Sequence, residues 1–240
     1  MRYHSGITWF DESVWINRQI TFENSTWQIT HKLKEREIPH SKDEVESWGL
    51  DSEAHGIFVC VNTRSRCEDA VVKVRMQIPY IKTAYNSGQE RAEQAPTCVS
   101  GLHPLTQFEV NALKGLTLKG CSSTPKFMGS KFQAQGSEDW VPGGYLDYVL
   151  MEKMSGTRPP AHWERVPQQE RDTVLAAFKR AYLECRACGW KHDDPGVQNI
   201  LWDSEKGKCY LVDWEDCTEI EPDAFWREGL YVMWNLKSDY

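Results

Sequence analysis

The fold is decided largely by Gly189–Trp202 (GWKHDDPGVQNILW) together with Tyr210–Asp216 (YLVDWED). Gly189 is typical of a residue just past a helix end, and the apolar run that begins at Asn199 predicts a short strand. Because 203–207 (DSEKG) has the composition of a hairpin turn, we expect strands at 199–202 and 209–213 to pair. The hairpin would bring an imidazole, an amide and three carboxylates to one rim: His192, Asn199, Asp193, Asp194 and Asp213.

Upstream of this stretch, strand and helix patterns alternate. The β-branched runs 56–62 and 69–76 predict a hairpin, and 145–151 predicts a buried strand. Apolar residues at helical spacing predict one helix over 108–116 and another from Pro167 to just before Gly189. The last twenty residues are rich in aromatic side chains and predict a closing helix.

The order of these elements predicts an α+β protein of two lobes. We expect a strand-rich N-lobe at 56–151, a mainly helical C-lobe at 152–240 and a cleft between them. Residues 1–55 mix tryptophan and isoleucine with many charges, which predicts an N-terminal extension packed on the N-lobe. Residues 83–101 are rich in polar and small residues and predict either a polar connection or an imperfect helix.

Composition limits the class of protein. A chain of 240 residues that is 40% hydrophobic and 26% charged is typical of a globular protein. It has no apolar run of the roughly 18 residues that a membrane span needs and no apolar stretch after Met1, so we expect a cytoplasmic protein without membrane contact. A net charge of -7 disfavours DNA as a partner.

The 8 cysteines are spread through the chain, which favours reduced thiols over a disulfide framework. Only Cys185 and Cys188 form a CxxC pair. A structural zinc site needs a second pair of ligands, so we interpret these two as small residues near a helix end and expect no metal.

The C-terminal stretch resembles the catalytic loop of protein kinases and aminoglycoside phosphotransferases, in which an HxD base precedes an Asn by five residues and a hairpin ends in a metal-binding Asp. His192 and Asp194 match the HxD, Asn199 the amide and Asp213 the metal-side Asp. Lys73, in Val71–Val74, is similar to the strand lysine of these enzymes. The resemblance places its ion-pair partner at Glu109 and implies a two-lobed kinase-like fold.

One function implied by this resemblance is an ATP- and magnesium-dependent phosphotransferase that acts on a small molecule. Asp194 would be the base, Lys73 would contact the phosphates, and Asn199 and Asp213 would hold magnesium. A catalytically inactive kinase-like binding module is a further alternative.

The sequence departs from a phosphotransferase where ATP phosphates would bind. Such enzymes use a glycine-rich turn because only bare backbone N–H groups approach phosphate closely enough. In the stretch leading up to Lys73 the chain offers only Gly49 and Gly56, and the acidic residues Asp51 and Glu53 lie between them. The C-terminal acids could instead bind an organic cation, and a guanidinium pairs bidentately with carboxylates. The residues concerned are Asp193, Asp194, Asp213, Glu215 and Asp216.

The segments 141–145, 150–156 and 194–203 resemble a set of small fungal kinase-like proteins that includes the arginine-containing cyclodipeptide synthases of natural-product biosynthesis. This family joins arginine from arginyl-tRNA to a second aminoacyl group and releases a diketopiperazine, with no ATP or other cofactor at the synthase. The resemblance implies arginyl-tRNA and a second aminoacyl-tRNA as partners. It implies catalytic roles for Asp193, Asp194, His192 and Asn199, and substrate contacts for Asp213, Glu215, Lys73, Glu109 and Arg75.

A tRNA partner requires basic side chains, since the acceptor stem is polyanionic. Several lysines and arginines of the first half of the chain are candidates, while many acids crowd the C-terminal loop and hairpin. We therefore expect the basic and acidic functions to be divided between the two halves. His192 has an alternative role as a structural ring that bonds the loop backbone.

Overall fold

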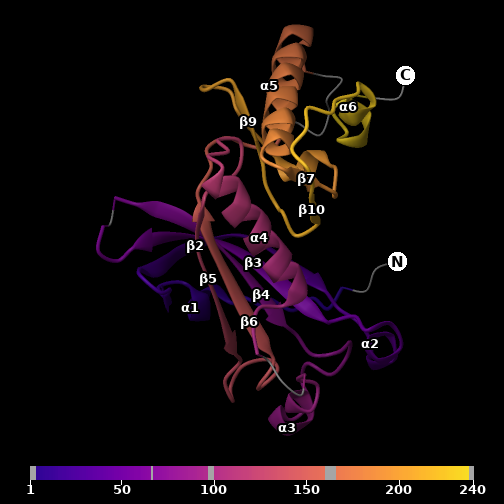
Figure 1. Cartoon of the computed structure of the whole chain (residues 1–240). Coiled ribbons are helices and arrows are strands. Elements are labelled where there is room, and N and C mark those ends of the chain that lie inside the picture. The colour runs from indigo at the N-terminus through magenta and orange to yellow at the C-terminus, as the bar shows by residue number, and fades with distance from the viewer. Residues whose placement is uncertain (1–3, 66, 97–99, 160–165, 238–240) are drawn as a thin grey trace. The chain divides into compact units, whose positions relative to one another are not determined.

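The computed structural model describes residues 4–65, 67–96, 100–159 and 166–237. The chain divides into two compact units, of which the first comprises 1–106 and 128–151 and the second 107–127 and 152–240. Both units are labelled by element in Figure 1.

The first unit is built on a six-stranded sheet with the order β1-β2-β3-β4-β6-β5. Neighbours among the first four strands pair antiparallel, and Trp27 and Asn62 face each other across β2 and β3. The strands are β1 (Gln19–Thr21), β2 (Thr26–Ile38), β3 (Glu53–Asn62), β4 (Asp69–Gln77), β5 (Phe127–Ala134) and β6 (Tyr145–Glu152). Three short helices accompany them: α1 (Glu12–Trp15), α2 (Lys42–Trp48) and α3 (Gly88–Ala92).

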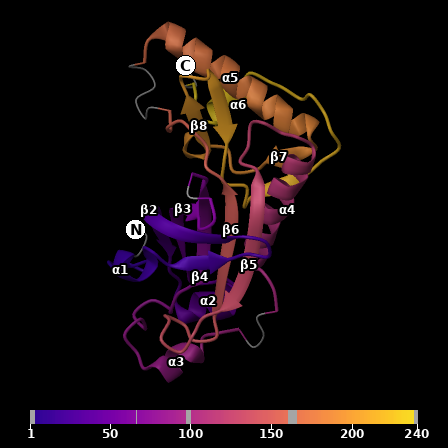
Figure 2. The same ribbon diagram turned by 90° about the vertical axis from the view of Figure 1, so that its left-hand side faces the viewer.

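The two faces of this sheet differ in chemistry because successive residues of a strand point to opposite sides. One face carries the hydrophobic core, in which Phe58, Val72 and Leu146 pack with Trp9 and Phe10. The opposite face of β3, β4 and β6 is polar and buried: Glu53, His55, Lys73, Arg75, Gln77, Tyr145 and Asp147. Figure 2 shows these strands from the side.

The second unit centres on the 20-residue helix α5 (Gln168–Ala187). Its buried face includes Val174, Phe178 and Tyr182, and the ring of Phe178 lies 5.1 Å from that of Trp234. Two antiparallel pairs and a 3-10 turn follow α5: β7 (Trp190–His192) with β10 (Cys217–Glu219), β8 (Ile200–Asp203) with β9 (Lys208–Leu211), and η2 (Val197–Asn199). The second unit also contains α6 (Gly229–Met233) and most of α4 (Pro104–Leu118), whose first three residues belong to the first unit.

The predicted fold class, a two-lobed kinase-like fold with a mainly helical C-lobe, is wrong. Within the described part of 152–240 the only α-helices are α5, with 20 residues, and α6, with 5. The rest is short strands, one 3-10 turn and loops. The predicted closing helix forms only over α6. The aromatic residues before it also pack on α5, but from a segment that is not helical: Trp226, for example, contacts Phe178 and Tyr182.

Other element predictions are confirmed. The hairpins at β3–β4 and β8–β9, the helices α4 and α5 and the strand β6 lie where the patterns indicate. The sequence did not indicate β1, β2 or β5; β1 and β2 are sheet strands inside the expected extension 1–55. The boundaries 1–55, 56–151 and 152–240 stay predictions. Among the described residues, no helix has both the length and the apolar character needed to cross a membrane.

Candidate functional site

The loop between α5 and β8 is held in place by backbone pairing. Gly189 has φ +76°, the left-handed conformation that turns the chain out of α5 into β7. β7 then pairs with β10, so that His192 faces Cys217 and the Asp193 N–H donates to the Asp216 carbonyl at 2.9 Å. The loop and the residues after the hairpin are thereby brought together, as the sequence predicts.

His192 is a buried ring at the base of this loop, 4% exposed. Its Nε2 lies 3.1 Å from the Val212 carbonyl, and its ring contacts those of Trp214 and Trp234 at 4.9 and 5.2 Å. Burial lowers the pKa of His192, although the charge of Asp213 opposes the shift. A neutral ring that donates to a carbonyl fits the structural alternative better than a proton-transfer role.

Asp194 and Asn199 form the central contact of the loop. The Asn199 side-chain amide is buried and donates to the Asp194 carbonyl at 3.0 Å and to its carboxylate at 2.8 Å. The Asn199 carbonyl accepts from the Val212 N–H at 3.0 Å, which ties the loop to the β8–β9 hairpin. Asp194 itself is exposed, so its carboxylate is positioned from behind and open to a substrate.

Asp193 has different surroundings from its neighbour. Its carboxylate forms an ion pair with Lys191 and accepts from the Thr218 hydroxyl at 2.5 Å. Burial favours the neutral acid, but the bonds from Lys191 and Thr218 outweigh it and lower the pKa of Asp193. Asp193 therefore stays charged and paired, and Asp194 is the better candidate for a base. Lys191 and Thr218 were not among the predicted site residues. Lys191 lies two residues before Asp193 in the sequence, and the pairing of β7 with β10 brings Thr218 to the same carboxylate.

Asp213 holds an unusual backbone conformation at the end of the hairpin. Its φ is +66°, in the left-handed region that costs most residues free energy and that Asp tolerates better than most. The next side chain, Trp214, is fully buried, and its Nε1 donates to the Leu211 carbonyl at 3.1 Å. The buried indole and the left-handed turn keep Asp213, Glu215 and Asp216 near the loop.

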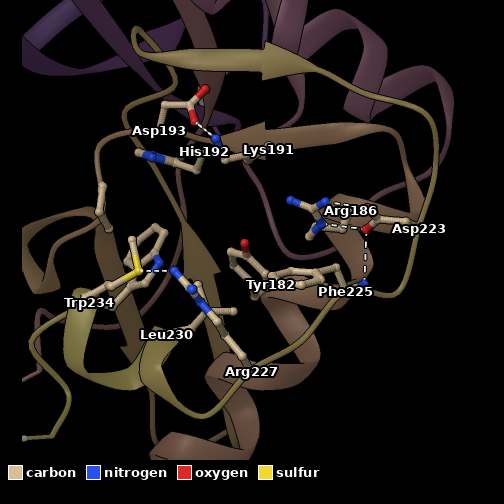
Figure 3. Close-up of a pocket in the computed structure, with 12 residues that line it drawn as sticks. Tyr182, Arg186, Lys191, His192, Asp193, Asp223, Phe225, Arg227, Leu230 and Trp234 are labelled. Atoms are coloured by element: carbon tan, nitrogen blue, oxygen red, sulfur yellow. Dashed lines mark hydrogen bonds and ion pairs between the residues drawn. The ribbon is translucent and has the colours of Figure 1, made fainter.

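A pocket of about 420 Å³ adjoins this loop (Figure 3). Lys191, His192 and Asp193 line one side, and Trp234 and Leu230 another. The remaining wall contains aromatic rings and charged groups, among them the ion pair of Arg186 with Asp223: Tyr182, Arg186, Asp223, Phe225 and Arg227. A pocket with aromatic walls and a few charged groups, next to the loop that carries Asp193 and Asp194, suits a small polar molecule.

Lys73 and Arg75, the basic residues that the resemblance assigns to substrate contacts, lie on the buried polar face of the sheet. Arg75 is 3% exposed and donates to Glu53 at 2.6 Å. Glu53 also lies 2.9 Å from His55 and accepts from the Tyr145 hydroxyl at 3.2 Å. Burial opposes ionisation of Glu53, but its bonds to His55 and Arg75 lower its pKa to about 2. Arg75 is therefore committed to an internal ion pair and is not at a surface that a tRNA phosphate contacts.

Lys73 and Glu109, the expected ion pair, are both buried. Lys73 lies on β4 of the first unit, and Glu109 lies on α4 in the second. Their pairing stays a prediction.

The two glycines before Lys73 have structural explanations. Gly49 ends α2 in the left-handed conformation, with φ +60°. Gly56 lies within β3, where a Cβ would come within 2.6 Å of the Phe58 ring. Neither glycine is in a turn that could hold phosphate, because the chain between β2 and β3 contains the helix α2.

No group of three or more His, Cys, Asp or Glu side chains in the described part of the chain is arranged to hold a metal ion. The sequence matches no protein-family model and no curated protein.

Proposed function

We propose that the protein catalyses aminolysis between two aminoacyl esters of tRNA and releases an arginine-containing diketopiperazine. The observation that carries this proposal is the exposed Asp194 carboxylate, fixed through Asn199 beside the left-handed turn at Asp213. It supplies a positioned base next to further carboxylates, which is what attack by an amine on an ester requires.

The reaction needs two ester aminolyses. Asp194 takes a proton from the α-ammonium or amine of one aminoacyl group, whose nitrogen attacks the carbonyl carbon of the other. The ester bond of the attacked aminoacyl group breaks, and the 3′-hydroxyl of its tRNA leaves with a proton. The dipeptide is then attached to the other tRNA. The free amine of the resulting dipeptidyl-tRNA then attacks its own ester, closes the six-membered ring and releases the second tRNA. No phosphate is transferred and no cofactor is consumed.

The carboxylates after the hairpin would bind the guanidinium of the arginyl group. Asp213 and Glu215 lie on the chain that the Asn199–Val212 bond holds against the loop. A guanidinium is planar and pairs with carboxylates through two parallel N–H bonds, so these acids favour arginine over a neutral amino acid. The neighbouring 420 Å³ pocket would accept the second aminoacyl group.

The proposal is tested by incubating the purified chain with arginyl-tRNA and each of the other aminoacyl-tRNAs in turn and identifying products by mass spectrometry. We expect a diketopiperazine from the unaltered protein and at least a hundredfold loss with Asp194→Asn, which keeps the size of the side chain but cannot accept the proton. Asp172→Asn is the control, since Asp172 is an exposed acid on α5. Absence of any diketopiperazine, or full activity of Asp194→Asn, would contradict the proposal.

A phosphotransferase remains the second candidate, because the Asp194–Asn199 contact followed by Asp213 is also the order that a magnesium–ATP site uses. The positions of Gly49 and Gly56 weigh against it. Thermal unfolding with and without MgATP separates the two candidates: a ligand at 100 times its Kd stabilises a protein by about 2.7 kcal/mol, and we expect no such shift.

A catalytically inactive binding module is the third reading. If the protein is such a module, neither the unaltered protein nor the Asp194→Asn variant forms product, so the substitution changes no chemical step.

A further inference from the structure

Three cysteines converge in the second unit, away from the loop that carries the acids. Cys121 follows α4, and Cys185 and Cys188 lie in and after the last turn of α5. The Sγ atoms of Cys121 and Cys185 are 3.9 Å apart, within hydrogen-bond distance for sulfur, and all three side chains are buried. The CxxC pair of the sequence thus has a third thiol beside it, which its spacing did not indicate.

The three thiols have unequal acidity. A hydrogen bond from the Cys185 thiol, aided by the backbone N–H of Ser123, outweighs burial and lowers the pKa of Cys121 to about 7. Burial raises the pKa of Cys185 well above its usual value and that of Cys188 to about 11. Near neutral pH the Cys121 thiol is therefore partly ionised, and the two thiols beside it are protonated.

Two other buried cysteines, Cys60 and Cys209, lack this arrangement. Cys60 lies near the Ala70 carbonyl at 3.5 Å and Cys209 near the Val174 carbonyl at 3.8 Å. Burial raises the pKa of each thiol to about 12. They are protonated, unreactive thiols and serve as controls within the same chain.

We propose that Cys121 and Cys185 form an oxidation site that reacts with hydroperoxides and closes to a disulfide. The Cys121 sulfur attacks the peroxide, the O–O bond breaks, and Cys121 becomes a sulfenic acid while hydroxide leaves and takes up a proton. The Cys185 sulfur then attacks the sulfenic sulfur, the S–O bond breaks and a second water leaves. Overall, two thiols and one hydrogen peroxide give one disulfide and two waters.

The geometry permits this closure with a small movement. A disulfide has sulfurs about 2.05 Å apart, so the two sulfurs must approach each other by about 2 Å. Cys121 lies in a loop rather than in a helix or strand, with Gly120 before it at φ +71°, and can supply that movement. The bond would join the chain after α4 to the last turn of α5, which leads directly into β7 and Asp193.

The unaltered full-length chain provides the first test. The reduced protein, freed of reductant, is treated with hydrogen peroxide, and the alkylated peptides are mapped without reduction. We expect a linked peptide pair containing Cys121 and Cys185, with a mass about 2 Da below the sum of the reduced peptides, at peroxide levels that leave Cys60 and Cys209 unmodified. Oxidation of Cys121 no faster than that of Cys60 would overturn the proposal.

Variants separate the two cysteines. Cys185→Ser should stop the reaction at a sulfenic acid on Cys121 that a dimedone probe traps, and Cys121→Ser should lose the rapid reaction with peroxide. Cys209→Ser, another buried cysteine change, should behave as the unaltered chain does. A link from Cys121 to Cys188 in place of Cys185 would overturn the assignment. If a variant does not fold, the peptide map of the unaltered chain decides alone.

Discussion

At the scale of single residues, Asp213 is the proposed site residue with a left-handed backbone conformation. An L-residue at φ +66° is disfavoured relative to glycine, and a side chain is retained there although the backbone would be more relaxed without one. The proposed function gives the carboxylate at this position a role that glycine could not fill.

We expect Asp213→Gly and Asp213→Ala to separate stability from activity. Both remove the carboxylate and should abolish product formation. Glycine adopts the positive φ without strain, so its free energy of unfolding should exceed that of the alanine variant by about 1 kcal/mol. Urea unfolding measures the difference, and equal stability of the two variants would contradict the backbone argument.

The buried Glu53 cluster predicts a second residue-scale effect. Glu53→Gln leaves the Arg75 guanidinium buried without its carboxylate, and breaking a buried ion pair in this way costs about 3 kcal/mol or more. Glu205→Gln, on the exposed β8–β9 turn, is the control and should change the free energy of unfolding by less than about 0.5 kcal/mol.

The same carboxyl group predicts a pH dependence. Its pKa is about 2 in the folded protein against 4.5 ordinarily, so the folded state binds the proton less readily than the unfolded state. The stabilisation is complete above pH 4.5 and is lost as the pH falls toward 2. Between these values we expect the Tm of the unaltered protein to fall more steeply than that of Glu53→Gln. Parallel curves would show that Glu53 does not titrate as described.

At the scale of elements, the packing of α4 on β7 depends on one glycine. A Cβ at Gly115 would lie 2.5 Å from Trp190 Nε1, closer than a carbon and a nitrogen approach each other. Trp190 begins the strand that leads into Asp193 and Asp194. Alanine, the better helix former, is therefore disfavoured at position 115 of α4 because of Trp190, which is distant in the sequence.

Gly115→Ala should accordingly destabilise the protein although alanine is the better helix former. We expect a loss of about 1–3 kcal/mol from the overpacking, reduced by the gain in helix propensity. Gly229→Ala, at the start of α6, is the matched control: nothing lies within 4 Å of its Cβ position, and its stability should stay equal or rise slightly. Thermal unfolding of both variants is the measurement.

At the scale of the whole molecule, the acidic charge is shared rather than divided. The first unit contains 13 Lys and Arg against 17 Asp and Glu, and the second 15 against 18, so their net charges are -4 and -3. The expected division of charge is therefore not a difference between the two compact units. It is present along the sequence, where residues 1–120 have a net charge of -1 and residues 121–240 a net charge of -6. The proposed contact with a tRNA would have to use a few local lysines and arginines, because neither unit is basic as a whole.

If the protein makes few contacts with tRNA phosphates, kcat/KM for the aminoacyl-tRNA depends only modestly on the salt concentration. For about two contacts, raising the salt concentration from 50 to 200 mM should lower kcat/KM for the aminoacyl-tRNA by roughly tenfold. A loss of a thousandfold or more would instead indicate an extensive basic interface, which the composition of the two units contradicts. Initial rates at the two salt concentrations decide between these outcomes.

Local sequence pattern determined the elements whose signals are local. Periodic apolar residues indicated α4, α5 and β6, and turn residues indicated the β3–β4 and β8–β9 hairpins. Asp194, Asn199 and Asp213 were predicted as one group because a short hairpin joins them, and the Asn199–Asp194 bond lies there. The strand β2 was missed because its second half, HKLKERE, has no apolar alternation to indicate pairing.

Only the tertiary structure decided the features that depend on contacts between distant segments. The pairing of β7 with β10 gave Asp193 its partner Thr218, and the neighbourhood of Trp214 and Trp234 made His192 a buried ring. The partnership of Cys121 with Cys185 and the buried pairing of Arg75 with Glu53 likewise join residues that the sequence separates. A sequence pattern specifies which face of an element is apolar, but burial, charge pairing and pKa follow from which other element covers that face.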